Sequence, residues 1–374
     1  MKNIGIYIHI PFCIKKCDYC DFISYCNKED FVEEYVENLI KEIKQELKKD
    51  EYKIRTIYIG GGTPSSIDSK YIVKILNTIK EKQNIENAEI TIEVNPGTVT
   101  NKKLLDYKKV GINRLSIGLQ ETHNELLKQI GRIHTYEEFL NTYNLARKVG
   151  FKNINVDLMI GLPNQSIQNI KENLEKITKL NPEHISVYSL ILEEGTPLYE
   201  KYKNNQIELP DEELERNMYW YVKNTLENNG YIHYEISNFA KKGYESRHNL
   251  DCWKQKEYIG FGLGAHSYIN RVRYSNRETK MGQTPFGPLP YSKIIHEEQN
   301  IEDMQKEYML LGLRKIEGVS VQKFKNKFGE NPIFLFKTEL NKLVTKKLLE
   351  VDGDVIKLTN KGLDFANLVW EEFV

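Results

Sequence analysis

The chain has 374 residues, and its 53 Lys and Arg balance its 53 Asp and Glu, so the formal net charge is zero. This balance excludes a global field that would draw the protein to nucleic acid or an anionic membrane, and no apolar run approaches the length of a membrane span. The length favours one large domain plus a smaller one. Because no targeting segment precedes the first strand pattern, we expect a cytoplasmic protein with reduced thiols.

The first predicted strand, residues 4–10, leads into a loop with three cysteines at Cys-x3-Cys-x2-Cys spacing: Cys13, Cys17 and Cys20. Thiols this close rarely form disulfides, and a zinc site normally needs a second Cys-x-x-Cys pair, which Cys26 and Cys252 do not supply. Three thiolates can instead hold three irons of a 4Fe–4S cluster and leave the fourth iron open to a ligand. Zinc or unliganded thiols are the alternative.

The cysteine loop also carries aromatic residues, among them Tyr19 and Phe22. Its spacing and its place after a strand resemble the cluster loop of the radical S-adenosylmethionine (radical SAM) superfamily. In that superfamily the open iron binds the amino and carboxylate groups of SAM. Apolar surroundings suit such a cluster, because burial and few hydrogen bonds keep its reduction potential low.

Strand-like runs alternate with helical patterns through the first two thirds of the chain. The predicted strands are residues 4–10, 54–60, 88–94, 112–118, 154–159 and 184–190. The predicted helices are residues 28–49, 69–81, 102–109, 124–130, 136–149, 166–180 and 211–228. Such β-then-α units predict parallel strands in an open doubly wound sheet, a barrel or a partial barrel.

Chemically distinctive residues follow the predicted strands, at the ends where parallel α/β folds bind ligands. The glycine run 60–62, followed by Thr63, lets the backbone approach the ends of an amino-acid ligand, although it could be only a tight turn. Glu93 suits a ribose hydroxyl, and a salt-bridged carboxylate is the alternative. Gln120 and Arg132 could hold a ribose or the SAM carboxylate, unless Arg132 is a surface cation. Asp157 lies in an apolar run, where an unpaired carboxylate is costly, so we favour a function for it.

Two further segments carry candidate metal-binding side chains. Residues 231–239 could form one more edge strand, and after them come His248 and Cys252, either of which is chemically able to hold haem iron. His266 follows alternate glycines at 260, 262 and 264, which do not have the spacing of a dinucleotide fingerprint. His248 could also only pack a loop, and His266 could be a hydrogen-bonded loop residue.

The sequence pattern after residue 279 predicts a small C-terminal module. Residues 279–291 read as a loop or linker. After it we expect helices at 302–314, 321–328, 333–339 and 340–347, a hairpin at 348–359 and a final helix at 360–373. This order is typical of a winged helix, but the charges are mixed and Asp352 and Asp354 lie on the wing. We therefore expect a docking or lid role and no nucleic-acid partner.

Longer phrases extend the resemblance over most of the chain. They are IYIHIPFC, CDYCDF, IGGGTPS, EVNPG, NRLSIGLQ, GRIH and DLMIGLPNQ, and they resemble the oxygen-independent coproporphyrinogen oxidase family, specifically its HemW branch. The resemblance implies cluster ligation by Cys13, Cys17 and Cys20. It implies a SAM pocket, with Tyr19 near the adenine, lined by Tyr7, Tyr19, Gly61, Gly62, Thr63, Glu93, Gln120, Arg132 and Asp157.

The same resemblance implies the fold: a partial (β/α)6 TIM-like barrel with a smaller, mainly helical, winged-helix-like C-terminal domain. We expect a radical SAM barrel at 1–240, a connecting region at 241–295 and a HemN-like domain at 296–374. Two features favour HemW over the oxidases. Phe22 stands where the oxidases have a further cysteine, and the first strand begins near residue 4, without their N-terminal extension.

HemW proteins carry His-Asn-x-x-Tyr-Trp, a motif implicated in haem binding. This chain keeps His248, Asn249 and Trp253 but has Cys252 for the tyrosine, which leaves open whether His248 or Cys252 would hold the iron. His266 is the third haem candidate. The resemblance implies a haem chaperone with an unidentified acceptor protein, through which it can meet a membrane surface peripherally, and an electron donor such as flavodoxin or ferredoxin. The alternatives are a coproporphyrinogen III dehydrogenase and an RNA-modifying radical SAM enzyme, and we assign no catalytic residue.

Overall fold

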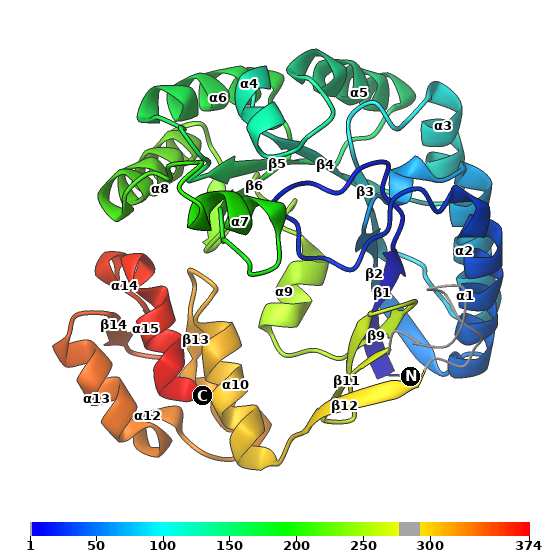
Figure 1. Ribbon diagram of the computed structural model, residues 1–374. Coiled ribbons are helices and arrows are strands. Elements are labelled where there is room, and N and C mark those ends of the chain that lie inside the picture. The colour runs from blue at the N-terminus through cyan, green and yellow to red at the C-terminus, as the bar shows by residue number, and fades with distance from the viewer. Residues whose placement is uncertain (1, 277–291) are drawn as a thin grey trace.

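The computed structural model describes residues 2–276 and 292–374. Its main feature is a large sheet in which six consecutive strands lie side by side and parallel, in chain order. They are β1 (Lys2–Ile10), β2 (Tyr52–Gly61), β3 (Glu89–Val94), β4 (Arg114–Gln120), β5 (Ile154–Ile160) and β6 (His184–Ser189). The sheet curves into an open barrel with helices around its outside (Figure 1). Each predicted strand is confirmed to within two residues at either end.

The helices around the barrel are α1 (Val32–Glu46), α2 (Ser69–Lys82), α3 (Asn101–Lys109), α4 (Asn124–Gln129), α5 (Tyr136–Val149), α6 (Ile167–Leu180) and α8 (Glu212–Asn228). Apart from α4, these helices share one core with the strands through their apolar faces. Helix α5 matches its predicted range residue for residue, because Thr135 and Glu138 form a capping box at its start and Gly150 ends it in the left-handed region at φ 96°. A further short helix, α7 (Pro197–Lys203), was not predicted.

Beyond β6 the sheet continues with a hairpin and not with the single edge strand expected at 231–239. Strands β7 (Ile232–Glu235) and β8 (Asn238–Ala240) pair antiparallel, and β8 pairs with β6. The Glu235 carboxylate accepts hydrogen bonds from the backbone N–H of Ser237 and the side-chain amide of Asn238, which fixes the turn. The prediction of one strand was wrong because an apolar run does not reveal a tight turn within it.

On the other side of β1 the segment predicted as a connecting region adds four strands to the sheet. Strand β9 (Tyr258–Phe261) runs parallel to β1, and β10 (His266–Ile269), β11 (Val272–Asn276) and β12 (Lys293–Glu298) follow antiparallel. Helix α9 (Arg247–Trp253) lies across the opening of the barrel (Figure 1). The predicted loop 279–291 lies outside the described residues.

The C-terminal module has the predicted helix-and-wing order with its own core. It contains α10 (Ile301–Gly312), β13 (Val319–Ser320), α11 (Val321–Phe328), α12 (Pro332–Leu335), α13 (Lys337–Thr345), β14 (Leu349–Asp352), β15 (Val355–Leu358), α14 (Asn360–Asp364), α15 (Ala366–Trp370) and a 3-10 turn, Glu371–Phe373. Strands β14 and β15 form the predicted hairpin, and β13 joins them. The expected single helix at 360–373 is broken at Phe365, whose ψ of 36° lies outside the helical region.

The module is attached to the barrel beside β7 and α9. The Arg314 guanidinium lies between two indole rings, 4.4 Å from Trp253 of α9 and 4.6 Å from Trp370 of α15. Its backbone carbonyl accepts from the N–H of Ile236, next to β7. These contacts protect a sheet edge and hold α9 against the module. No helix of the described residues is long and apolar enough to cross a membrane.

Candidate functional site

The three predicted cluster cysteines lie on one half-buried loop at the carboxyl end of β1. Backbone hydrogen bonds hold this loop at both ends: Cys13 N–H donates to the Tyr25 carbonyl at 3.0 Å, and Asp18 N–H donates to the Ile130 carbonyl at 3.0 Å. The Cys13 sulfur is 3.5 Å from Thr63 Oγ1. Cys17 accepts a hydrogen bond from Arg132 at 3.4 Å.

The chemistry of this loop fits a cluster. Burial raises the pKa of the Cys13 thiol and brings the pKa of Cys20 to about 11, so binding of iron would release protons from these thiols. Within the described residues no three Cys, His, Asp or Glu side chains are already gathered as ligands of a metal ion.

The glycine run after β2 packs directly under the cysteine loop. The N–H groups of Gly62 and Thr63 donate to the carbonyls of Ile10 and Phe12 at 2.9 and 2.7 Å. Gly61 has a φ of 111°, and a Cβ there would lie 2.5 Å from the His9 ring. A Cβ at Gly62 would lie 2.9 Å from two backbone carbonyls. Only glycine fits these positions, because the chain's own backbone and His9 approach so closely.

Glu93 is held inside the barrel beside this run. Its carboxylate accepts from the Tyr58 hydroxyl at 2.9 Å and from the Gly61 N–H at 3.2 Å. Burial raises the Glu93 pKa to about 7 against the opposing effect of the Tyr58 hydrogen bond. The carboxylate is therefore costly to ionise in the protein, as expected for a group placed for a ligand and not for stability.

Tyr7 and His9 join this pocket to the cysteine loop. The Tyr7 hydroxyl lies 3.0 Å from His9 Nδ1, and His9 Nε2 lies 2.8 Å from the Ile23 carbonyl, just past the third cysteine. The Tyr7 ring is stacked on Tyr58 with centroids 6.4 Å apart. His9 was not among the predicted site residues, because nothing in an apolar strand marks one inward-facing polar side chain as a link to a loop.

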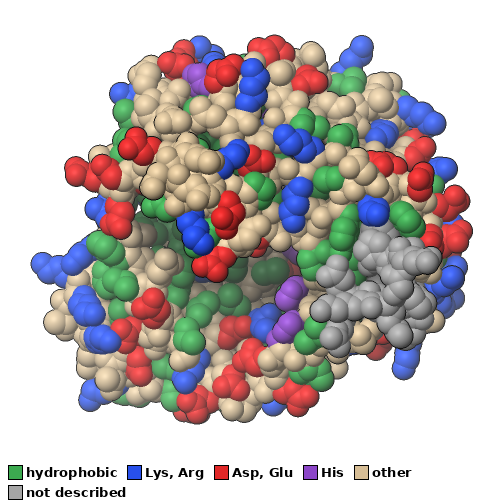
Figure 2. Space-filling view, viewed as in Figure 1, with side chains coloured by type: hydrophobic (Ala, Val, Ile, Leu, Met, Phe, Trp, Pro, Cys, Tyr) green, Lys and Arg blue, Asp and Glu red, His purple; other side chains and the backbone are tan. Residues whose placement is uncertain are grey.

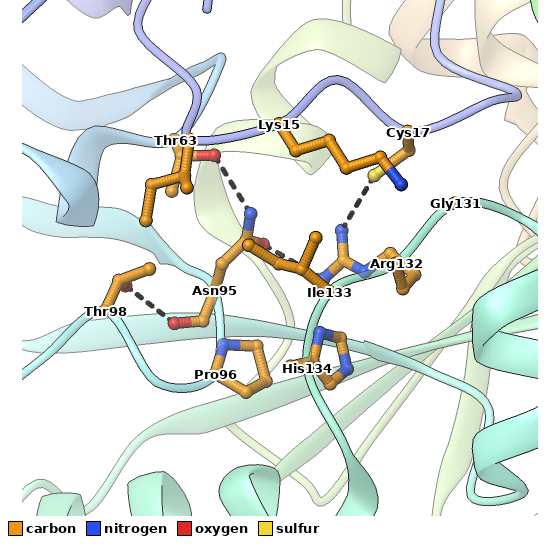
Figure 3. A pocket seen from close by; sticks show the side chains of 11 residues that line it. Lys15, Cys17, Thr63, Asn95, Pro96, Thr98, Gly131, Arg132, Ile133 and His134 are labelled. Atoms are coloured by element: carbon orange, nitrogen blue, oxygen red, sulfur yellow. Dashed lines mark hydrogen bonds between the residues drawn. The ribbon is translucent and has the colours of Figure 1, made fainter. Parts of the chain in front are cut away.

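Arg132 is buried, so its alternative as a surface cation is wrong. Besides Cys17 it donates to the Asn95 side chain at 3.1 Å and to the Gly118 carbonyl at 2.5 Å. Figure 3 shows its guanidinium reaching toward Cys17, with Asn95 between Arg132 and Thr63. The Asn95 amide donates to Thr63 Oγ1 at 2.9 Å. Asn95 is thus a further positioning residue, for which only its place after a strand was a signal.

Of the remaining predicted residues, Gln120 is the last residue of β4 and Asp157 lies in the middle of β5. Gln120 has a φ of 73°, and such left-handed backbone in a non-glycine residue often marks a functional position. Asp157 is hydrogen-bonded by Asn155 at 2.6 Å and Ser116 at 3.2 Å, and burial raises its pKa despite these donors. Tyr19 packs against a small apolar cluster that includes Met159. The structure therefore gathers the predicted SAM-pocket residues inside the barrel and at the carboxyl ends of its strands, where Asp157 interacts electrostatically with Glu93 and Arg132.

The haem candidate His248 lies on α9 and is buried. Its Nδ1 is 2.9 Å from Thr56 Oγ1, and its ring lies 5.3 Å from that of Tyr58, the residue that also donates to Glu93. Its backbone N–H donates to the Glu89 carboxylate at 3.1 Å. Burial lowers the His248 pKa to about 4, so the imidazole is neutral at pH 7.

The other two candidates are Cys252, which is half-buried, and His266, which is exposed. Burial raises the pKa of Cys252, also on α9, to about 12, which keeps it a thiol. His266 on β10 is exposed and stacks on His296 of β12, with ring centroids 5.3 Å apart and planes 13° apart. His296 Nε2 lies 2.7 Å from Ser275 Oγ. His296 was not predicted, because no motif contains it and its strand had not been recognised.

Comparison with known proteins agrees with this geometry. Residues 7–177 match the family model of the radical SAM superfamily, and residues 301–365 match that of the HemN C-terminal domain. The chain is 38% identical to a protein of Lactococcus lactis named "Heme chaperone HemW" over 100% of this chain and 98% of the relative. Proteins of the same name from Bacillus subtilis and Escherichia coli are 38% and 32% identical, over 98% and 100% of this chain and 98% and 99% of the relatives.

A solved structure shares the fold of the whole chain. Coproporphyrinogen III oxidase (HemN) from Escherichia coli, described as a radical SAM enzyme, superposes with a TM-score of 0.84 at 22% sequence identity. The match covers 100% of this chain and 90% of HemN. At this identity the likeness confirms the architecture of a radical SAM barrel with a C-terminal helical domain, and nothing about the reaction.

Proposed function

Because the chain belongs to the HemW family of radical SAM proteins, we propose that it binds haem and passes it to an acceptor protein, as the name of its relatives says of them. The full-length similarity to proteins named as haem chaperones carries this proposal. We place the function in the cytoplasm, where an oxygen-sensitive cluster and reduced thiols can persist. The proposed parts are the barrel at 1–240, the region of α9 to β12 at 241–295 and the HemN-like domain at 296–374.

We further propose that Cys13, Cys17 and Cys20 hold a 4Fe–4S cluster whose open iron takes SAM. When bound, the cluster supplies one electron to SAM, delivered by a donor such as flavodoxin or ferredoxin. The protein's part is to position these groups. Arg132, fixed by Asn95 and the Gly118 carbonyl, holds a positive charge next to the Cys17 sulfur.

The pocket below the cysteine loop is suited to the nucleoside part of SAM. Glu93 and Asp157 offer carboxylate oxygens to ribose hydroxyls, and Gln120 lies between them at the end of β4. The backbone around Gly61 and Gly62 is close enough to meet the amino-acid part, with Thr63 beside Cys13. Tyr7 and Tyr19 provide rings on two sides, and Tyr19 is proposed for the adenine.

Haem is the proposed cargo, and the acceptor that takes it is unidentified. Its three proposed contact residues are His248 and Cys252 on α9 and His266 on β10. Electrostatic contact between Cys252 and Arg273 of β11, which also lies close to His266, supports this grouping. None of the three candidates lies among the cluster cysteines, which supports an iron ligand separate from the SAM pocket.

An anaerobic haem titration of the cluster-reconstituted protein tests the proposal. We expect saturable binding with a shifted haem absorption band. The same sample is then given SAM, a reductant and coproporphyrinogen III, and its porphyrin products are analysed. Saturable haem binding without decarboxylated product supports a chaperone. Decarboxylated product without haem binding would show a coproporphyrinogen III dehydrogenase and contradict the proposal.

A further inference from the structure

Two of the eight histidines are exposed, and they touch each other. All eight lie in described residues, and the exposed ones are His266 of β10 and His296 of β12. Strand β11 runs between them, with Ser275 opposite His266 in the register. The small Ser275 side chain leaves room for the two rings to meet above it at 5.3 Å. Histidine side chains line a wall of the hollow between the barrel and the C-terminal module (Figure 2).

The two imidazole rings differ in their hydrogen bonds to the described residues. His296 Nε2 is fixed by Ser275 Oγ at 2.7 Å. Neither ring nitrogen of His266 has a hydrogen-bond partner among residues 2–276 and 292–374. Burial, His296 and Arg273 lower the His266 pKa, so the ring is neutral at pH 7 and keeps a free lone pair. A neutral imidazole with an uncommitted nitrogen is a ready ligand for iron.

The two candidates on α9 lack this freedom. His248 has only 9% of its surface exposed, its Nδ1 is bonded to Thr56, and its helix is held through Trp253 by Arg314. Cys252 is half-buried on the same helix, and burial raises its pKa so that it stays a thiol. Because a porphyrin is much wider than a side chain, iron inside it reaches an imidazole only where a broad surface is open. Iron of haem could meet His248 only after α9 had moved.

We propose that His266 is the axial ligand for the iron of incoming haem, and that His296, anchored by Ser275, is a positioning residue that holds the His266 ring by stacking. This inference rests on the proposed function, because it assigns a binding residue to the haem cargo. It places haem uptake on the face formed by β10, β11 and β12, outside α9.

Apolar side chains next to the pair suit the porphyrin ring. Ile294, opposite Ser275 in the register, is 40% exposed. Ile23 is 38% exposed and lies against the turn before β10, since a Cβ at Gly264 would be 2.4 Å from Ile23 Cδ1. Phe22, next to Ile23, is 63% exposed. Apolar side chains exposed together mark a binding surface, and a porphyrin would remove this one from water.

Charge at the same rim suits the propionates of haem. Lys16 donates to the Phe22 carbonyl at 2.9 Å, which holds its ammonium group beside the apolar residues. A propionate that reaches Lys16 would gain an ion pair in a partly apolar setting. The face therefore offers an iron ligand and an apolar contact at Ile23 and Ile294, and the adjoining loop adds a cation.

Titration with hemin of three full-length proteins tests the assignment. We expect His266→Ala to raise the dissociation constant about tenfold or more and to displace the absorption band from that of the wild type. His248→Asn changes the rival candidate on α9 and replaces a buried imidazole by a smaller group that can still meet Thr56, so it should weaken hemin binding less than His266→Ala does. Thermal unfolding of each variant shows whether it is folded. Metal-free protoporphyrin IX, which has no iron to ligate, should bind equally to the wild type and to His266→Ala.

A second pair of variants tests the role of His296. His296→Ala removes both the stacked ring and its nitrogens and should weaken hemin binding by about threefold to tenfold. His296→Phe keeps a ring for stacking and should restore both the affinity and the wild-type absorption maximum. If His296→Phe instead matches His296→Ala, the nitrogen of His296 acts on iron, and the positioning role is wrong.

The failure of this inference differs from the failure of the proposed function. If the wild type does not bind hemin saturably, the haem chaperone proposal itself falls. If it does, but folded His266→Ala keeps the wild-type affinity and spectrum while His248→Asn loses both, the assignment to His266 is overturned and α9 holds the iron.

Discussion

The mouth of the barrel and the face of β10 to β12 are built in opposite ways. At the mouth, Arg132 is bonded to Cys17, Asn95 and the Gly118 carbonyl at once, and Glu93 is fixed by Tyr58 and Gly61. On the other face His266 is exposed and free of hydrogen bonds to the described residues. Interlocked side chains suit a group that stays, because they are organised before it binds. An open ligand suits a cargo that arrives and leaves.

The largest effect should come from the cysteine loop. Replacing Cys17 by alanine removes one of three sulfur ligands and leaves Arg132 without its sulfur acceptor. We expect the reconstituted variant to lose its cluster and the cluster absorption at about 400 nm, and to bind little iron. Iron and sulfide analysis with ultraviolet–visible spectroscopy measures this loss.

Cys26 offers a matched control, because it is a half-buried free cysteine of the same region outside the Cys-x3-Cys-x2-Cys spacing. Cys26→Ala should keep the cluster. Equal loss of iron in the Cys26 and Cys17 variants would mean that the cluster uses a different ligand set, and the interlocked picture of the mouth would fail.

Glu93→Gln should separate binding from stability at the mouth. The Glu93 pKa is raised from 4.5 to about 7, so ionisation of this buried carboxyl lowers stability as the pH rises from 4.5 to 7. The variant should therefore be more stable by about 3 kcal/mol at pH 8, with no gain below pH 4.5. It should bind SAM about tenfold or more weakly, because a charge-assisted hydrogen bond is lost. Urea unfolding at the two pH values and a SAM titration measure both effects.

The result for Glu93→Gln shows whether Glu93 is kept for its ligand or for the stability of the fold. A gain in stability with weaker SAM binding shows a residue kept for its ligand. A loss of stability at pH 8 would show that the carboxylate supports the fold, and its place in the SAM pocket would need another explanation.

The smallest effect concerns His248. Its pKa is lowered from 6.5 to about 4 in the folded protein. Between these pH values His248 is therefore protonated in the unfolded chain and neutral in the folded chain. The free energy of unfolding should fall as the pH drops from 6.5 to 4, and His248 alone should account for about 1 kcal/mol at pH 5.5. Urea unfolding at pH 8 and pH 5.5 measures this effect. The drop in the free energy of unfolding between the two pH values should be smaller in His248→Asn than in the wild type by this amount. An equal drop in both proteins would mean that His248 is in contact with solvent, and that it does not differ from His266 in burial.

The barrel could be predicted from the sequence because local signals agree there. Runs rich in Ile and Val become strands, and caps such as Thr135 and Gly150 end the helices between them. The cluster cysteines, Glu93 and Asp157 were found for a related reason: a parallel fold gathers the carboxyl ends of its strands, whatever the details of packing. Their place in one site follows from topology alone.

The haem side could not be predicted in the same way. The pair of His266 and His296 depends on strand pairing across β11, and no local pattern reports such a contact between distant residues. Likewise the HemW motif identified His248 as a candidate but did not indicate that it is buried. Its burial depends on Thr56 of β2 and on Arg314 of the C-terminal module. Asn95 and His9 were missed because their importance lies in the partners they reach.

The central claim is that the cargo site and the radical SAM site are separate, and a haem titration of cluster-free protein tests it most directly. Hemin would be titrated anaerobically into Cys17→Ala and into reconstituted wild type, with thermal unfolding to confirm that both are folded. We predict the same absorption maximum and dissociation constants within about threefold. Loss of saturable haem binding in a folded Cys17→Ala protein would contradict the account, because haem would then depend on the cluster.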